Sequence, residues 1–252
     1  MIIRQAQIDV FEDGSSPEFE NQLIRHLQEF SPLHSELLGE QGVRPIVRKA
    51  VERAAKYSWT RRGPVQLFVD LIFLLGVVFD TDPQYPWIAE ILARSTTDAQ
   101  VARADEMHEQ VMAYLDATGG PGREYAKRAL RRAREMSYEG PRIASPSYSA
   151  EALRRARAAY PEKYDYLGVD LVSKVIEGGL SEARRYSVTS DAGVALFTSL
   201  MFALGYGVLR DPKYPFIEST LTNSAISEPN RRVERVYSKM ITYLDRVLER
   251  AG

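Results

Sequence analysis

The chain aligns with itself when residue 32 is placed on residue 161. Residues 32–116 then pair with residues 161–245 without a gap, and many of the pairs are identical or similar in character. The segment DPQYPWI at residues 82–88, for example, pairs with DPKYPFI at residues 211–217. A repeat of this length is the size of a small domain, whereas solenoid repeats are shorter. The sequence therefore predicts a tandem duplication of one module.

Both copies of the module carry helical patterns. Apolar side chains recur every three or four residues between Phe19 and Phe30, and again over residues 43–57, as on the buried face of a helix. Residues 64–78 are apolar on nearly every side, and so is their counterpart at residues 192–206. Because a helix of that kind is normally enclosed by others, we expect these two segments at the centres of the modules.

The rest of each module continues the helical pattern. Pro86 is expected to begin a short helix that ends near Leu92, because proline is favoured at the first helical position. A last helix is predicted over residues 98–117, and its counterpart over residues 229–250. No segment shows the alternation of apolar and polar residues that is typical of a strand. The expected fold class is therefore all-α, with about five helices in each module.

Glycine and proline mark the boundary between the modules. Residues 119–122, GGPG, break the helical pattern, and residues 140–147 are expected to form a loop. Between them, residues 123–136 predict an arginine-rich helix. The expected organisation is a first module over residues 1–118, a linker with this basic helix over residues 119–148, and a second module over residues 149–252. The pattern leaves open whether residues 1–15 form an arm or a helix, and whether the modules share one core.

Composition excludes several classes of site and partner. The chain has no cysteine, so disulfides, thiolate catalysis and cysteine-bound metals are excluded. A formal net charge of −1 gives no general attraction to nucleic acid or to an anionic membrane. The most apolar run, residues 65–79, is shorter than the roughly 20 residues that span a bilayer, and the start of the chain lacks the apolar core of a signal peptide. We therefore expect no membrane span, and the absence of cysteine fits a reducing cytosol without identifying the compartment.

Residues for catalysis or metal binding do not form a recognisable motif. There is no Gly-x-Ser-x-Gly motif and no phosphate-binding glycine loop, and the three histidines lack the spacing of metal ligands. Asp70, Asp80 and Asp82 are the best candidates for a divalent metal site. The second copy has Ser199 and Leu209 in place of Asp70 and Asp80, so we favour a turn role for Asp82 and no metal. We expect no catalytic residue and no cofactor, and the alternative is an enzyme with an unrecognised site.

Five aromatic residues are candidates for contact with a partner protein, because tyrosine and tryptophan are frequent in interfaces. They are Trp59, Tyr85, Trp87, Tyr214 and Phe216. The last four belong to the same turn in the two copies, and we favour the interpretation that Trp87 and Phe216 fill the core beside that turn. Trp59 pairs with Val188, so a large ring is not needed there for folding. Trp59 is therefore the better candidate for a partner contact.

The basic helix is the strongest local charge feature of the sequence. Arg128, Arg131 and Arg132 lie within it and are further candidates for a partner contact. One hypothesis is that this helix binds nucleic acid or an anionic membrane. Glutamates are interleaved with the arginines, and stacking aromatic residues are sparse. We therefore favour a solvated helix that pairs with acidic residues of both modules, and nucleic acid is the alternative partner.

Several short segments of the first copy are distinctive in combination. They are IRQAQ at residues 3–7, Leu38-Gly39, AAKYS at residues 54–58, residues 73–76, residues 79–82 and Pro86-Trp87. Together they resemble a family of small, uncharacterised helical bacterial proteins encoded near type VI secretion and related contractile-injection genes, often beside genes for tip proteins or toxins. The second copy resembles a degenerate repeat, because Val208-Leu209 replace Phe79-Asp80.

The resemblance implies a cytoplasmic accessory role as an adaptor, a toxin chaperone or an immunity protein, and it supplies no catalytic residues. Taken with the absence of catalytic motifs, it gives the leading hypothesis of a non-enzymatic helical scaffold. The expected partner is another protein, either a tip component or a toxin of a bacterial secretion system. The sequence does not give the identity of this partner or the oligomeric state.

Overall fold

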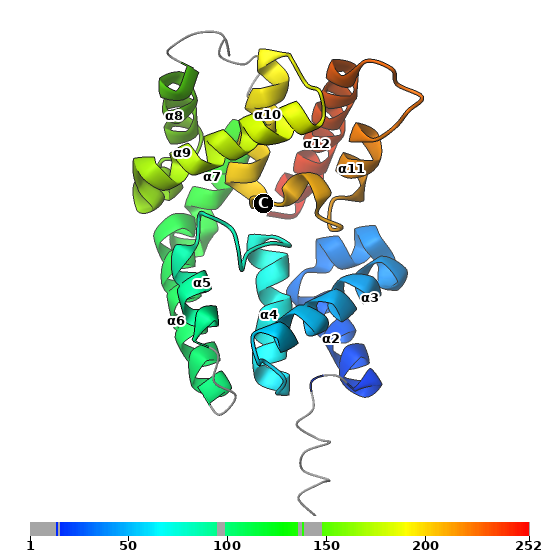
Figure 1. Ribbon diagram of the computed structural model, residues 1–252, viewed down its shortest axis with the longest axis vertical. Coiled ribbons are helices and arrows are strands. Elements are labelled where there is room, and N and C mark those ends of the chain that lie inside the picture. Colours follow the sequence, from blue (N-terminus) through cyan, green and yellow to red (C-terminus); the bar gives the residue numbers. More distant parts are fainter. Residues whose placement is uncertain (1–13, 15, 95–98, 136–137, 139–147, 252) are drawn as a thin grey trace, which may run out of the picture. The chain divides into compact units, whose positions relative to one another are not determined.

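Helices make up most of the structure, a computed structural model that describes residues 14, 16–94, 99–135, 138 and 148–251 (Figure 1). These residues contain no β-strand, and short turns connect the helices. The predicted all-α class is therefore confirmed. The conformation of residues 1–13 and the predicted loop at residues 140–147 lie outside the described residues.

The chain forms two compact units. The first unit runs to Thr81 and continues from Tyr85 to Val111. The second unit contains Asp82–Gln84 and the chain from Met112 onward. The change from one unit to the other at Val111 falls inside a continuous helix, so the glycine-rich segment 119–122 lies within the second unit and is not a boundary between units. Residues 119–135 of the predicted linker thus belong to the second unit.

The first unit is built around helix α4 (Arg62–Leu75), on which α2 (Pro17–Phe30) and α3 (Pro32–Lys56) pack. Helix α5 (Pro86–Ala93) and the first part of α6 (Gln100–Gly119) also belong to it. The prolines at 17, 32 and 86 begin α2, α3 and α5, as expected from the preference of proline for the first turn. The side chain of Ser16 caps α2 by accepting a hydrogen bond from the backbone N–H of Phe19 at 3.2 Å.

The second unit contains the end of α6 and the helices that follow it. They are the short 3₁₀ helix η2 (Pro121–Arg123), α7 (Glu124–Glu135), α8 (Tyr148–Ala159), α9 (Pro161–Arg185), α10 (Asp191–Leu204), the short 3₁₀ helix η3 (Val208–Arg210), α11 (Pro215–Leu221) and α12 (Pro229–Ala251). Helix α10 packs on α9 and contacts α12, and the basic helix α7 packs on α12 and α8. The apolar helix of this unit is therefore enclosed, as its composition predicts.

Helix bounds recur in the two units in the same register as the sequence repeat. Helices α3 and α9 begin at the paired positions 32 and 161 and end at the paired positions 56 and 185, and α4 and α10 end at the paired positions 75 and 204. Both long helices contain a kink, at Gly39 (φ 61°) and at Gly168 (φ 77°). These matched bounds and kinks are what a duplication predicts. The sequence places the start of the first of these helices near residue 43, but it begins at residue 32 because the chain stays helical on both sides of the kink.

None of the helices in the described ranges is both long enough and apolar enough to cross a membrane. The apolar helices α4 and α10 have 14 residues each, and most of their apolar side chains are buried. Their apolar character is therefore accounted for by burial within the two units.

Candidate functional site

Trp59 lies in the core of the first unit. Its side chain is fully buried, with 0% of its surface exposed, and its ring meets the edge of Phe68 at a centroid distance of 6.2 Å. The guanidinium of Arg103 lies 6.0 Å from the same ring. Val188, the counterpart in the second copy, is also buried. The structure corrects the expectation of a partner contact at Trp59, because a ring enclosed in this way offers no surface to a partner.

The four aromatic residues of the repeated turn divide into two pairs. Tyr85 and Tyr214 are buried, whereas Trp87 and Phe216 are partly exposed. The Tyr214 ring meets Tyr243 edge-on at 5.4 Å, and burial raises its pKa well above 10. The Phe216 ring lies 6.2 Å from the Tyr243 ring as well. The two buried tyrosines therefore fill the core beside the turn, in place of Trp87 and Phe216, which were predicted to do so. Of these four residues, Trp87 and Phe216 are the ones that offer part of their surface to a partner.

Three arginines of α7 are engaged by groups of the second unit. Arg128 forms an ion pair with Glu162 of α9. Arg132 donates to the backbone carbonyl of Ala158 at 3.3 Å, and Arg131 is exposed. A neighbouring arginine on the same helix, Arg134, pairs with an aspartate of α12 at 2.6 Å. Two arginines of the basic helix thus neutralise acidic groups on their own unit, which leaves less positive charge for nucleic acid than the sequence alone indicates.

The three aspartates considered as a metal site have separate partners. Asp70 accepts from His26 at 2.8 Å, and burial raises its pKa in spite of this neighbour. Asp80 is held by Arg53 and by the hydroxyl of Tyr57. Asp82 belongs to the other unit. In the described residues, no group of three or more histidine, aspartate or glutamate side chains is arranged to hold a metal ion.

A buried polar cluster surrounds the C-terminal end of α10. The ammonium group of Lys163 donates to the carbonyl of Phe202 at 2.5 Å, and the side-chain amide of Gln84 donates to the carbonyl of Met201 at 3.1 Å. The backbone N–H of Tyr206 donates to the Asp82 carboxylate at 2.8 Å. Because the last carbonyls of a helix have no partner within it, Lys163 and Gln84 act as a cap supplied by distant parts of the chain.

Burial at this cap disfavours the charged forms of Lys163 and Asp82. Burial lowers the pKa of Lys163 to about 8, and the nearby Asp82 opposes that fall. Burial also raises the pKa of Asp82, against the hydrogen bonds from Tyr206 and Gln84. The cluster holds α10 and the segment 82–84 together, but it offers no opening to a substrate, because Lys163, Asp82 and Gln84 are all buried.

Lys163 was not identified from the sequence, although a signal was present. It lies one helical turn before the buried Leu167, on the same face of α9, and its counterpart in the first copy is His34. A lysine on the inner face of a helix is unusual, because lysine is almost never fully buried without a partner. That partner, Asp82, lies far earlier in the chain, before α5, and cannot be found from local patterns.

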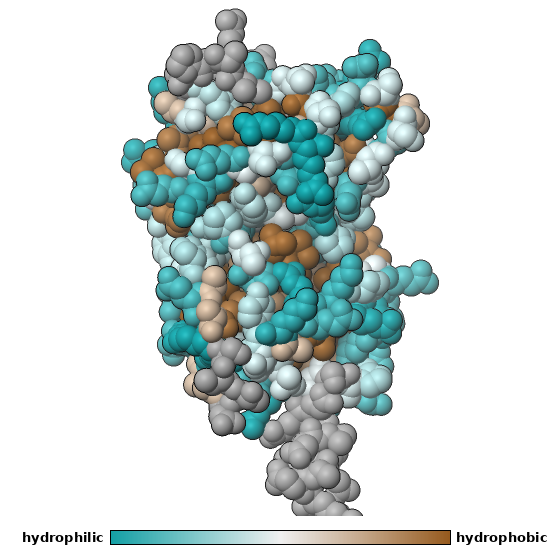
Figure 2. Space-filling model, in the orientation of Figure 1, coloured by the Kyte–Doolittle hydropathy of each residue, from teal (hydrophilic) through white to brown (hydrophobic). Residues whose placement is uncertain are grey.

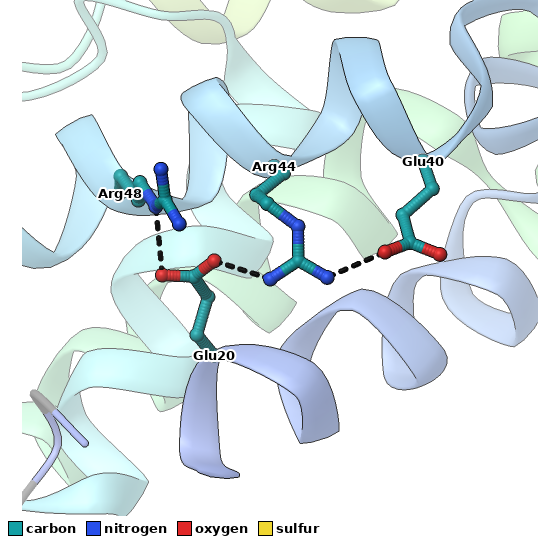
Figure 3. A network of polar contacts seen from close by, with 4 residues as sticks. All are labelled: Glu20, Glu40, Arg44 and Arg48. Carbon is teal, nitrogen blue, oxygen red and sulfur yellow. Dashed lines mark hydrogen bonds and ion pairs between the residues drawn. The ribbon is translucent and has the colours of Figure 1, made fainter. Parts of the chain in front are cut away.

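Ion pairs on the surface of the first unit join α2 to α3. Figure 3 shows the Glu20 carboxylate between Arg44, at 2.5 Å, and Arg48, at 2.9 Å, with Glu40 on the far side of Arg44. Burial opposes ionisation of Glu20, but the two arginines outweigh it, and its pKa lies below the ordinary value. The second copy has Ser173 and Glu177 in place of Arg44 and Arg48, so this network belongs to the first copy alone.

Exposed apolar side chains gather on the N-terminal half of α9. Tyr166 is 44% exposed and Val169 is 51% exposed, on either side of the kink at Gly168. Figure 2 shows apolar surface over this part of α9, with hydrophilic side chains around it. The Tyr166 ring is held edge-on by the buried Tyr114, with centroids 5.2 Å apart. We call Tyr166 and Val169 the α9 surface.

The α9 surface was also missed in the sequence, although the repeat contains a signal for it. Val169 pairs with Glu40 in the first copy, so one copy has an apolar side chain where the other has an exposed charge. Tyr166 pairs with Leu37, which is 39% exposed. The comparison of the copies therefore marks position 169 as a surface position that is apolar in only one of them.

No protein-family model, curated protein or solved structure matches the chain.

Proposed function

We propose that this protein is a non-enzymatic helical scaffold whose α9 surface binds another protein. The observation that carries the proposal is the exposure of both Val169 and Tyr166 on the same part of one helix. Apolar side chains that are exposed together mark interaction sites more often than single ones do. Tyrosine is also enriched among the residues that dominate binding energy.

The geometry of the α9 surface favours binding without a large rearrangement. Tyr166 is already oriented by its contact with Tyr114, so little side-chain entropy is lost when a partner covers it. The exposed Asp165 and Asp170 flank the two apolar residues. A partner that places an apolar side chain between basic groups would complement this arrangement.

The non-enzymatic part of the proposal rests on how the ionisable groups are used. The buried carboxylates of Asp80 and Asp82 and the ammonium of Lys163 are engaged in structural contacts. His26 and Asp70 form a pair, but a catalytic pair needs a nucleophile or substrate position beside it. The resemblance of the first copy to secretion-associated proteins supplies the proposed partner, a tip component or a toxin of a bacterial secretion system, which this chain would serve as adaptor, chaperone or immunity protein.

The test is capture of the partner by the full chain and by two variants. Val169→Asp places a charge on the α9 surface, and Val101→Asp places the same charge on α6, where Val101 is 44% exposed. We expect the unchanged chain and Val101→Asp to recover a secretion or toxin protein from the native cells, and Val169→Asp to recover at least about 10-fold less, equivalent to about 1.4 kcal/mol. Equal recovery by both variants would refute the α9 surface as the binding site.

A further inference from the structure

One exposed face of α6 combines carboxylates with apolar side chains. Val101 is 44% exposed and Met112 is 43% exposed, and they lie about three helical turns apart on the same side of the helix. Exposed acidic residues occupy that side as well, at the spacing of three or four residues that places side chains in one row: Asp105, Glu109 and Asp116. Within the described ranges, these three carboxylates form no ion pair. We call the five residues the α6 face.

One exposed face of α12 has the same spacing and the opposite charge. Its five residues are all exposed and follow one another at the same intervals as those of the α6 face: Arg231, Arg235, Lys239, Thr242 and Arg246. Lys239 donates to the hydroxyl of Thr220 at 2.8 Å, whereas the three arginines have no acidic partner among the residues that the structure describes. We call these five residues the α12 face.

The arginines of the α12 face differ from those of the neighbouring α7. Two arginines of α7 are paired with acidic residues of α9 and α12. In the repeat register, Arg235 and Arg246 correspond to Glu106 and Ala117, so the module does not require a cation at either position. The positive charge of the α12 face is therefore available to a partner.

We infer that the α6 face of one molecule binds the α12 face of a second molecule of the same chain. When the two helices run in the same direction, the three carboxylates lie opposite three cations of the α12 face, and Met112 lies opposite Thr242. The two faces do not cover each other within one molecule, because the side chains of both are exposed. Opposite charges favour the pairing of unlike faces, and like charges disfavour the pairing of two α6 faces or two α12 faces.

Both kinds of side chain contribute to the binding. Exposed ion pairs are individually weak. Val101 and Met112 add apolar surface that loses contact with water, and the methylene groups of arginine side chains are suited to cover it. Because each molecule carries both faces, the association either closes as a two-fold dimer or continues from molecule to molecule. Tyr166 and Val169 belong to neither face, so this self-association is independent of partner binding at the α9 surface.

The test reverses the charge of each face in a separate chain. One variant carries a basic α6 face, through the three changes Asp105→Lys, Glu109→Lys and Asp116→Lys. The other carries an acidic α12 face, through the three changes Arg231→Glu, Arg235→Glu and Arg246→Glu. Within either variant the two faces have the same sign and repel, whereas an equimolar mixture of the variants again offers opposite signs for both contacts.

A control variant makes the same change of net charge as the first variant at exposed positions of α2, α3 and α9, through Glu29→Lys, Glu52→Lys and Glu177→Lys. Sedimentation of each full chain at several protein concentrations gives the average mass and the dissociation constant. We expect the mass of the unchanged chain and of the control to rise with concentration to twice that of one molecule or more. The dissociation constant should increase at least about 10-fold in each reversed variant and return to within about 3-fold of the unchanged value in their mixture.

Three results would overturn the inference. The first is an unchanged chain that stays monomeric up to about 1 mM. The second is a reversed variant that associates as well as the unchanged chain, or no better and no worse than the control. The third is an equimolar mixture of the reversed variants that does not associate, since the loss in each variant would then have a cause other than the charges of these faces.

Discussion

Among single residues, Lys163 is the one whose environment differs most from what its residue type predicts. Its ammonium group is buried against the end of α10, beside Asp82. The carbonyl of Phe202 and the charge of Asp82 compensate only part of the loss of water, since its pKa is lowered to about 8. The buried ammonium group caps α10, but it lowers the free energy of unfolding at neutral pH. Because Lys163 loses its proton at a lower pH in the folded chain than in the unfolded chain, the free energy of unfolding depends on pH.

The sign of that linkage gives the first prediction. The unfolded chain holds the Lys163 proton up to an ordinary pKa near 10.4, whereas the folded chain begins to lose it near pH 8. Between these values the unfolded chain binds more protons, so the free energy of unfolding rises with pH. Below pH 8 Lys163 is protonated in both the folded and the unfolded chain. Its contribution to the free energy of unfolding is then constant and at its least favourable value. The deprotonation of Lys163 should therefore raise the free energy of unfolding by about 2 kcal/mol between pH 7 and about pH 9.5.

Urea unfolding at the two pH values measures this contribution by comparing variants. Lys163→Met should remove the rise, whereas Lys174→Met, an exposed position on the same helix, should keep it. The pH range stops below 10, the ordinary pKa of tyrosine, because two buried tyrosines would add a second effect above it. Burial raises the pKa of Tyr57 and of Tyr243 to about 12. Above pH 10 the folded chain therefore binds more protons at these tyrosines than the unfolded chain does, and the free energy of unfolding falls as the pH rises. The same pH dependence in both variants would show that Lys163 is not the group responsible.

At the scale of helices, the backbone at two glycines decides where the chain turns. Gly39 (φ 61°, ψ 175°) and Gly168 (φ 77°, ψ 167°) interrupt α3 and α9 at equivalent positions. Residues with a side chain almost never adopt this conformation. A Cβ atom at either position would have no neighbour within 4 Å, so the requirement for glycine comes from the backbone and not from crowding.

The second prediction concerns these kinks. Gly168→Ala should lower the free energy of unfolding by about 1–3 kcal/mol, because the backbone must either accept strain or give up the kink. Gly63→Ala is the matched control, since a Cβ atom there also has space and α4 has an ordinary helical backbone at that point. The control should be neutral or slightly stabilising. If both changes have the same effect on the urea midpoint, the kink does not require glycine.

Local patterns were sufficient for most helices but not for their contacts. The proline at residue 86 and the apolar run at residues 64–78 predicted α5 and α4 to within a few residues. The kink at Gly39 was missed, because a glycine that ends a helix and one that bends it look the same in sequence. The cap formed by Lys163 and the segment 82–84 was missed, since its members meet only through the tertiary fold. Trp59 was misplaced, because its pairing with Val188 showed a tolerated change of size and not exposure.

At the scale of the molecule, the sequence repeat and the compact units do not coincide. Asp82–Gln84 belong to the second unit although the residues on either side belong to the first, and α6 passes from one unit into the other. The end of α6 contributes to the second unit, where the Tyr160 hydroxyl donates to the carbonyl of Thr118 at 2.8 Å. The bounds of the sequence repeat therefore differ from those of the compact units, and the α9 surface is supported by Tyr114 of α6, which lies outside the second repeat.

The central claim is that the α9 surface binds a protein partner, and crosslinking in living cells tests it most directly. A photoreactive amino acid replaces Val169 in one version of the full chain and Val101 in another, since both side chains are exposed. The account predicts that light produces a covalent complex with a secretion or toxin protein from position 169 and not from position 101. It would be contradicted if position 169 gave no complex, or if both positions gave the same one.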